Sequence, residues 1–160
     1  MPKSLLSKKG FTLIEMLITL AILAILAAAV LPLAKVSVKR EKEIELRRNL
    51  RVIREAIDTY KKLADDKKFE YDEETYGYPL DLETLVNGIE IKEEVEGKEI
   101  ERLVKFLRRI PKDPMMNSTE WGLRSYQDDL DSTAWGGENL YDVFTRSPGI
   151  ALDDSKYKDW

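Results

Sequence analysis

The feature that most constrains this chain is an apolar run near its N-terminus, which extends from Phe11 to Ala34 and is broken by one acid, Glu15. A run of about 20 apolar residues is long enough to span a bilayer as a helix. A carboxylate inside such a run costs about 2.5–3.5 kcal/mol on insertion scales, which indicates that the acid has a function. The run therefore predicts a membrane-spanning helix with a functional acid near its start.

A short basic leader, residues 1–10, precedes this run; it contains three lysines and no acid, and it ends in Gly10. Such a charge bias predicts that the N-terminus lies in the cytoplasm. A secretory signal peptide is one alternative, but its apolar region is about 7–15 residues long and ends at a small-residue cleavage site. An ordinary single-pass anchor is a second alternative, and it leaves Glu15 unexplained.

The stretch KKGFTLIE, residues 8–15, resembles the type III signal of type IV pilins and pseudopilins. This resemblance implies that a membrane-embedded prepilin peptidase cuts after Gly10 and N-methylates the new first residue, Phe11. It also implies that Glu15 pairs with the terminal amine of a neighbouring subunit while a filament assembles. Residues 1–10 are accordingly expected to be a cleaved prepilin leader.

Beyond the apolar run the sequence becomes charged but keeps a helical period, with apolar residues spaced alternately four and three apart: Leu46, Leu50, Ile53, Ile57, Tyr60 and Ala64. This spacing predicts an amphipathic helix with one buried face. We therefore expect one long helix over residues 11–64, weakened at Pro32 by its missing N–H. Its first half, residues 11–34, suits lipid before assembly and a filament core afterwards, and its second half should pack on a globular head, residues 65–160.

The head is expected to combine helices and strands. Asp81 and Gly88 have the positions of an N-cap and a C-terminal stop around a short helix. The apolar spacing over residues 100–107 predicts another amphipathic helix. Residues 121–127 and 140–145 predict two antiparallel strands joined by a long loop. The expected class is α+β: a pilin fold, with a long N-terminal α-helix packed on a small antiparallel β-sheet head.

Three short segments narrow the resemblance towards the major pseudopilins, the G-type group, of type II secretion: Tyr78-Pro79, IPKDP at residues 110–114, and YDVFT at residues 141–145. The implied function is a structural subunit of a helical pilus-like filament that takes part in protein transport. A type IV pilus pilin, used in adhesion, motility or DNA uptake, is the alternative. The implied partners are other copies of the chain, minor pilins or pseudopilins, and an inner-membrane assembly platform. The implied location is the bacterial inner membrane with the head in the periplasm, followed by a periplasmic or surface filament.

Composition argues against several other functions. The chain has no cysteine and no histidine, which removes disulfides, the commonest general base and the usual zinc ligands, so an enzyme is not expected. Loss of the three leader lysines would change the formal net charge from −4 to −7, which disfavours nucleic acid as a partner. A set of arginines on the long helix could form a DNA-binding strip: Arg47, Arg48, Arg51 and Arg54. We favour a solvated face, or one that pairs with acids of adjacent subunits such as Glu41, Glu43 and Glu45.

The C-terminal tail holds acids that could bind a cation. Major pseudopilins commonly have a calcium-binding loop after the last strand, and this chain departs from their pattern there. Asp153, Asp154 and Asp159 are candidate calcium ligands, because calcium prefers six to eight oxygens from carboxylates and carbonyls. The alternative is a solvated acidic loop in a tail that Tyr157 and Trp160 hold by packing.

Overall fold

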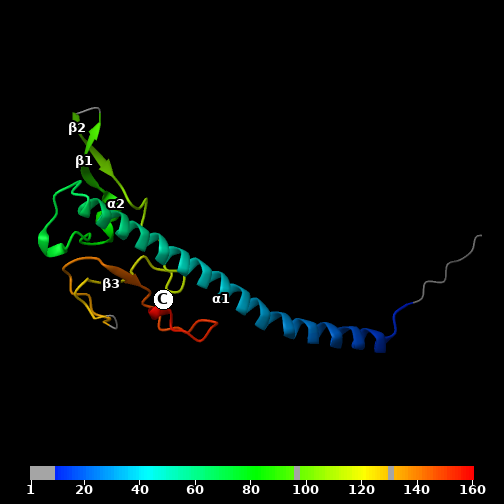
Figure 1. The fold of residues 1–160 in the computed structure, drawn as a ribbon. Coiled ribbons are helices and arrows are strands. Elements are labelled where there is room, and N and C mark those ends of the chain that lie inside the picture. The colour runs from blue at the N-terminus through cyan, green and yellow to red at the C-terminus, as the bar shows by residue number, and fades with distance from the viewer. Residues whose placement is uncertain (1–9, 96–97, 130–131) are drawn as a thin grey trace, which may run out of the picture. The chain divides into compact units, whose positions relative to one another are not determined.

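The computed structural model describes residues 10–95, 98–129 and 132–160, and its fold is α+β (Figure 1). A long N-terminal helix is followed by small antiparallel two-stranded sheets, an arrangement consistent with the pilin fold. The fold class expected from the sequence is therefore confirmed. The chain divides into two compact units between Lys39 and Arg40, and the globular head lies in the second unit, Arg40–Trp160.

Helix α1 extends over Leu13–Asp65 and includes Pro32. It ends in two backbone hydrogen bonds, from Lys67 N to Ala64 O at 2.9 Å and from Lys68 N to Leu63 O at 3.0 Å. Lys67 takes a left-handed conformation, with φ 53°. These are the bonds of a Schellman motif, which satisfies the last free carbonyls of a helix. The end predicted where the apolar period stops, near residue 65, is confirmed.

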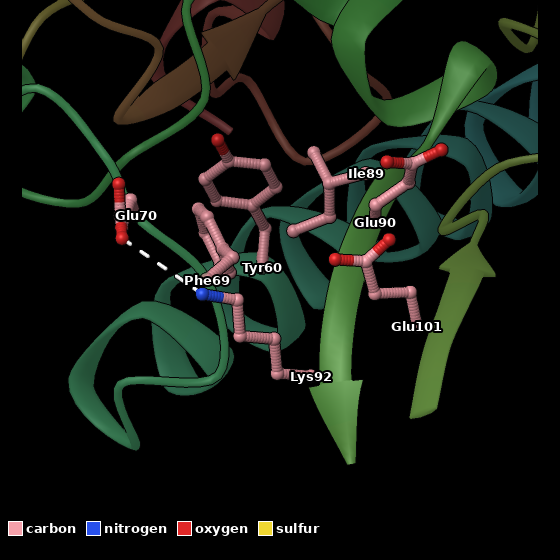
Figure 2. A pocket seen from close by; sticks show the side chains of 7 residues that line it. All are labelled: Tyr60, Phe69, Glu70, Ile89, Glu90, Lys92 and Glu101. Atoms are coloured by element: carbon pink, nitrogen blue, oxygen red, sulfur yellow. Dashed lines mark ion pairs between the residues drawn. The ribbon is translucent and has the colours of Figure 1, made fainter. Parts of the chain in front are cut away.

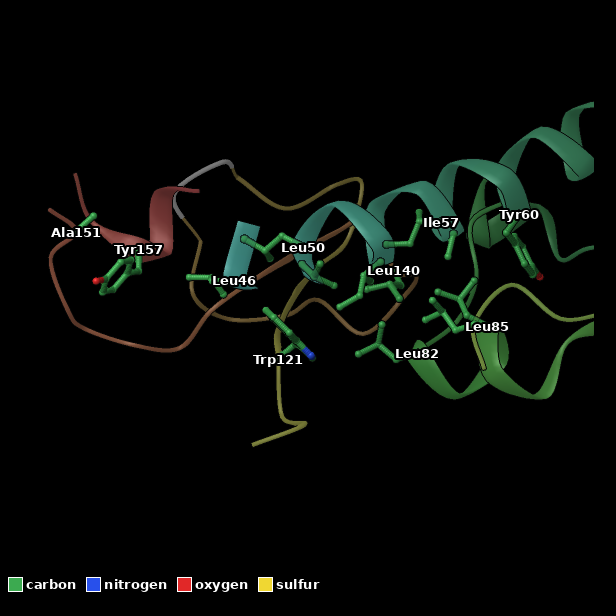
Figure 3. Packing of buried hydrophobic residues seen from close by; sticks show 14 residues of the cluster. Leu46, Leu50, Ile57, Tyr60, Leu82, Leu85, Trp121, Leu140, Ala151 and Tyr157 are labelled. Atoms are coloured by element: carbon green, nitrogen blue, oxygen red, sulfur yellow. The ribbon is translucent and has the colours of Figure 1, made fainter. Parts of the chain in front are cut away.

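The core of the head is built on the apolar face of α1 (Figure 3). Leu46, Leu50 and Ile57 are at most 2% exposed, and they pack in one cluster with residues from the later elements. Full burial of such a side chain contributes about 1.5–3 kcal/mol relative to exposure. The later elements supply Leu82, Leu85, Trp121, Leu140 and Val143. One face of a single helix therefore supports most of the head.

Helix α2, Leu82–Asn87, has the caps that the sequence predicts. Asp81 Oδ1 accepts a hydrogen bond from Thr84 N at 2.8 Å, and Gly88 follows the helix with φ 83°. A Cβ at Gly88 would lie 2.4 Å from Val104 O, so this position needs glycine for space as well as for conformation. The backbone here passes directly into the first strand.

Strand β1, Ile89–Val95, pairs antiparallel with β2, Lys98–Val104, and Ile89 lies opposite Val104. The helix predicted over residues 100–107 is therefore wrong. The apolar residues of β2 fit a helical spacing, whereas Ile89 and Ile91 alternate with charged residues as in a strand. Pairing between the two segments determines the structure of both, and this tertiary interaction cannot be predicted from the spacing of apolar residues within one segment.

Strand β3, Gly122–Arg124, pairs antiparallel with β4, Asp142–Phe144, as the sequence predicts. Both strands are shorter than the predicted segments. A Cβ at Gly122 would lie 2.4 Å from the Phe144 ring, so the glycine allows the ring to cross the neighbouring strand. The pair places Val143 in the core and leaves Asp142 half-buried beside α1.

An open pocket of about 420 Å³ lies between the first hairpin, the end of α1 and the loop that follows it (Figure 2). The rings of Tyr60 and Phe69 pack edge to face there, with centroids 5.1 Å apart. Lys92 Nζ lies 3.9 Å from Glu70 Oε1, and Glu90 and Glu101 complete the charged lining. Aromatic packing thus attaches the loop to the helix beneath it.

Candidate functional site

The N-terminal part of the candidate site is the start of α1. Thr12 precedes the helix, and its Oγ1 accepts a hydrogen bond from Glu15 N at 3.2 Å. Its carbonyl accepts from Met16 N at 3.1 Å. Threonine followed three residues later by glutamate is the sequence of a capping box. The helix start is thus fixed three residues before Glu15, and Thr12 is a positioning residue that the sequence analysis did not single out.

The side chain of Glu15 is exposed on the first turn of α1. Within the residues that the structure describes, no ion pair involves this carboxylate. Gly10 is open, because a Cβ there would meet nothing within 4 Å, and Phe11 is 78% exposed. Cleavage after Gly10, methylation of Phe11 and pairing of Glu15 remain predictions, and all three residues are exposed.

The apolar part of α1 that follows is exposed along its length, as Leu17, Ile22 and Leu31 illustrate with exposures of 56%, 53% and 68%. In the described part of the chain, α1 is the one helix long and apolar enough to cross a membrane. An exposed apolar surface of this extent requires a lipid or protein environment. Glu15 and this apolar surface therefore lie together on one exposed segment of α1.

The three predicted calcium ligands lie in the tail, which the structure shows as ordered. Asp153 Oδ1 accepts from Ser155 N at 3.1 Å, and its Oδ2 lies 3.2 Å from Arg47 Nη2. The hydrogen bonds from Ser155, with a smaller effect of Arg47, lower the pKa of this carboxyl. Asp154 is exposed, and Asp159 lies in the short 3₁₀ turn η2, Tyr157–Asp159.

Across residues 10–95, 98–129 and 132–160, no three acidic side chains gather in a way that could hold a metal ion. One oxygen of Asp153 is committed to an arginine and the other to a serine. Calcium binding by Asp153, Asp154 and Asp159 stays a prediction, and it would require these side chains to rearrange.

A buried glutamate on α1 holds the tail instead. Glu43 is 7% exposed, and its Oε1 accepts from Leu152 N at 2.9 Å and from Tyr157 OH at 2.8 Å. Burial, with the hydrogen bond to Glu43 as the next cause, raises the pKa of Tyr157 to about 12. This role was not predicted from the sequence, although Glu43 lies three residues before Leu46 and continues the apolar period of the helix.

Arg47 and Arg54 of α1 bind the end of the tail. Arg54 Nη2 donates to Trp160 O at 2.8 Å, and its Nε donates to Asp142 Oδ1 at 2.7 Å. Arg47 Cζ lies 3.9 Å from the centre of the Trp160 ring, a distance typical of a cation–π contact. Arg47 and Arg54 thus pair with Asp153 and Asp142 of the same chain, whereas the pairing expected from the sequence was with acids of adjacent subunits.

The comparisons with known proteins bear on the N-terminal part of the site. Residues 5–31 match the family model of the prokaryotic N-terminal methylation motif. The matched segment contains Gly10, Phe11 and Glu15, and it supports the type IV pilin and pseudopilin class. This pilin-type motif implies processing by a prepilin peptidase and assembly into a filament. No curated protein and no solved structure matches the chain.

In the head, residues 141–145 contact two other segments singled out in the sequence, Tyr78-Pro79 and residues 110–114. Asp113, from the second segment, is fully buried, and its Oδ2 accepts a hydrogen bond from Thr145 Oγ1 of the third. Its Oδ1 accepts from the backbone of Met115 at 2.7 Å. The first segment reaches the third through the rings of Tyr78 and Tyr141, which lie edge to face at 5.3 Å. The three segments therefore form one connected cluster.

Proposed function

We propose that the chain is made as a precursor, cut after Gly10, methylated on Phe11 and assembled through Glu15 into a helical filament. The methylation motif at residues 5–31 is the observation that carries this proposal. Glu15 is costly in lipid as an isolated charge, and pairing with the terminal amine of a neighbouring copy would remove that cost. Filament assembly would thus be favoured, because it removes the free-energy cost that the unpaired Glu15 has in the lipid-embedded subunit.

The apolar surface of α1 has two successive environments in this proposal. Before assembly, residues 11–34 span the inner membrane once, in contact with lipid, and the head, residues 65–160, lies in the periplasm. In the filament the same surface packs on copies of itself. The chain then acts as a structural subunit, and its chemistry is assembly.

Within this class we propose the major pseudopilin of a type II secretion system. The support is the contact between the three segments described above. In this contact, Asp113 and Thr145 join the segment that precedes β3 to the end of β4. The partners in this proposal are the prepilin peptidase, minor pseudopilins and an inner-membrane assembly platform. The filament would push folded proteins outward.

The processing step is tested by the intact mass of membrane-purified protein. The wild-type chain should lack residues 1–10 and carry one added methyl group. Gly10→Val should keep the leader, because the peptidase requires a small residue before the cut, whereas Gly10→Ala should be processed. A wild-type protein that retains Met1 would contradict the proposal.

The secretion function is tested by deleting the gene and measuring the export of folded extracellular proteins. We expect export to stop and to return with the wild-type gene. Normal export together with a loss of surface pili, adhesion, motility or DNA uptake would instead identify a type IV pilus pilin.

A further inference from the structure

The head contains a groove that the proposed function does not use. It has a volume of about 790 Å³ and lies between α1 and the segment from Arg109 to Lys112. Ile44 and Val52 of α1 face it and are 63% and 38% exposed. Asn49 Nδ2 donates to Lys112 O at 2.8 Å, which fixes the two walls relative to each other. The groove is therefore preformed and partly apolar.

The charged side chains at this groove are mostly basic. Arg48, Arg109 and Lys112 line it together with two acids, Glu41 and Glu45. In the described part of the chain, none of the three cations takes part in an ion pair. Exposed cations beside an apolar floor suit an acidic partner that also carries an apolar or aromatic side chain.

The same head carries a segment of that chemistry after the end of α1. Residues 70–74, EYDEE, contain four acids, and all five side chains are exposed. Tyr71, the one aromatic residue among residues 70–74, is 41% exposed. The 3₁₀ turn η1, Glu73–Thr75, holds the backbone, since Asp72 Oδ1 accepts from Glu74 N at 3.1 Å. A loop that is already ordered loses little conformational entropy when it docks.

The groove and the acidic loop lie at different ends of the head's part of α1. The groove is lined by helix residues 41–52, whereas the loop follows the end of the helix at Asp65. At 1.5 Å per residue, the 17 residues from Arg48 to Asp65 span about 25 Å. Two different surfaces that bind each other between copies form a heterologous contact, and such contacts build helical filaments when they do not close into a ring.

We propose that this groove receives the acidic loop, residues 70–74, of a second copy of the chain. Arg48, Arg109 and Lys112 would face the carboxylates of the loop, and Tyr71 would cover Ile44 and Val52. The inference rests on the proposed filament and names the contact between the heads of successive subunits. The contact would be renewed at each added subunit, because every head carries both surfaces.

The absence of cysteine from the chain allows a direct test by cross-linking. Glu73→Cys places a thiol on the acidic loop, and Thr119→Cys places one at the groove; both positions are exposed. The full-length double variant is produced in cells with its assembly machinery and treated with a short bis-maleimide. We expect a ladder of dimers, trimers and larger products. Thr133→Cys replaces Thr119→Cys in the matched control, because Thr133 is an exposed threonine outside the groove, and no ladder is expected there.

A charge reversal gives a second measurement. Arg109→Glu should lower the yield of pelletable filament by more than about tenfold, since like charges facing each other across an interface are strongly disfavoured. Arg146→Glu, at an exposed arginine outside the groove, should leave the yield unchanged. Wild-type filaments without a ladder, or an unchanged yield for Arg109→Glu, would overturn this inference and leave the proposed function intact. If the wild-type chain forms no filament, the proposed function and this inference fail together.

Discussion

At the scale of single residues, Glu43 of α1 links the long helix to the C-terminal tail. Its carboxylate accepts hydrogen bonds from Leu152 N and Tyr157 OH in a buried position. A buried charge is stable only when it is paired or hydrogen-bonded, and here both donors come from the tail. The chain contains no cysteine, so this hydrogen-bonded contact, together with packing, closes the C-terminal region without a disulfide.

Replacing this carboxylate should destabilise the head. Glu43→Ala leaves the Leu152 amide and the Tyr157 hydroxyl without their acceptor, which costs about 1–3 kcal/mol in the free energy of unfolding. The measurement is denaturant unfolding of a fragment of residues 35–160. Glu45→Ala, on the exposed side of the same helix, should change the free energy of unfolding by less than about 0.5 kcal/mol. Equal values for the two variants would contradict the role of Glu43.

The contact between Glu43 and Tyr157 also predicts that the stability of the head falls at alkaline pH. The pKa of Tyr157 is about 12 in the folded head, above its ordinary value of 10.0. The folded state therefore keeps a proton that the unfolded state loses, so stability is complete below pH 10 and falls as the pH rises towards 12. Tyr157→Phe should be less stable than wild type at neutral pH and should lose less stability in this window. If the free energy of unfolding falls equally with pH in wild type and in Tyr157→Phe, the Tyr157 hydroxyl does not cause the loss of stability.

Glu15 should matter for assembly and not for the head. We expect Glu15→Val to insert into the membrane and to be processed, but to give little filament, because the pairing with a neighbouring amine is lost. Thr19→Val is a matched control, since it also removes a polar group from the first turns of the apolar helix, and it should assemble normally. The measurement is the amount of filament that can be sheared and pelleted from cells. Wild-type amounts from the Glu15 variant would exclude the pairing role.

At the scale of elements, the sequence predicts those whose signals are local. The four-three apolar period identifies α1, the caps Asp81 and Gly88 identify α2, and short runs of β-formers identify β3 and β4. The strand at Lys98–Val104 could not be predicted in this way, since its apolar spacing also fits a helix and its pairing with Ile89–Val95 determines the outcome. The bonds of the tail were missed for a related reason, because Glu43 and Tyr157 are 114 positions apart.

Arg54 links three elements and gives a prediction at this scale. Its guanidinium donates to Asp142 and Val143 in β4 and to the carbonyl of Trp160. A lysine ammonium cannot reproduce this planar set of donors, so Arg54→Lys should lower the free energy of unfolding by about 1–2 kcal/mol. Arg51→Lys, at an exposed position one turn earlier, should have almost no effect. The melting temperatures of the two variants are compared in the fragment of residues 35–160. Equal melting temperatures for Arg54→Lys and Arg51→Lys would disprove the role of Arg54.

At the scale of the whole molecule, calcium offers a choice between two ways of holding the tail. If Asp153, Asp154 and Asp159 bind calcium, free calcium at 100 times the Kd adds about 2.7 kcal/mol to the free energy of unfolding. This gain raises the melting temperature by on the order of 10 °C. If packing and the hydrogen bonds to Glu43 hold the tail without calcium, the melts with calcium and with a chelator coincide. In that case Trp160→Ala should lower the melting temperature, whereas Asp153→Ala should leave it almost unchanged, because the ion pair of Asp153 with Arg47 is solvent-exposed.

The position of Glu43 and its partners along the chain also determines when the head can close. Glu43 and Tyr157 are 114 residues apart, so the entropic cost of closing this long loop must be met before their hydrogen bond can stabilise the head. At synthesis rates of about 5–20 residues per second, the interval between the two residues lasts roughly 5–20 s. A helix forms within about a microsecond. For most of this interval the nascent chain lacks Leu140 and Val143, which later pack on the apolar face of α1, so a chaperone that shields this face has several seconds in which to act.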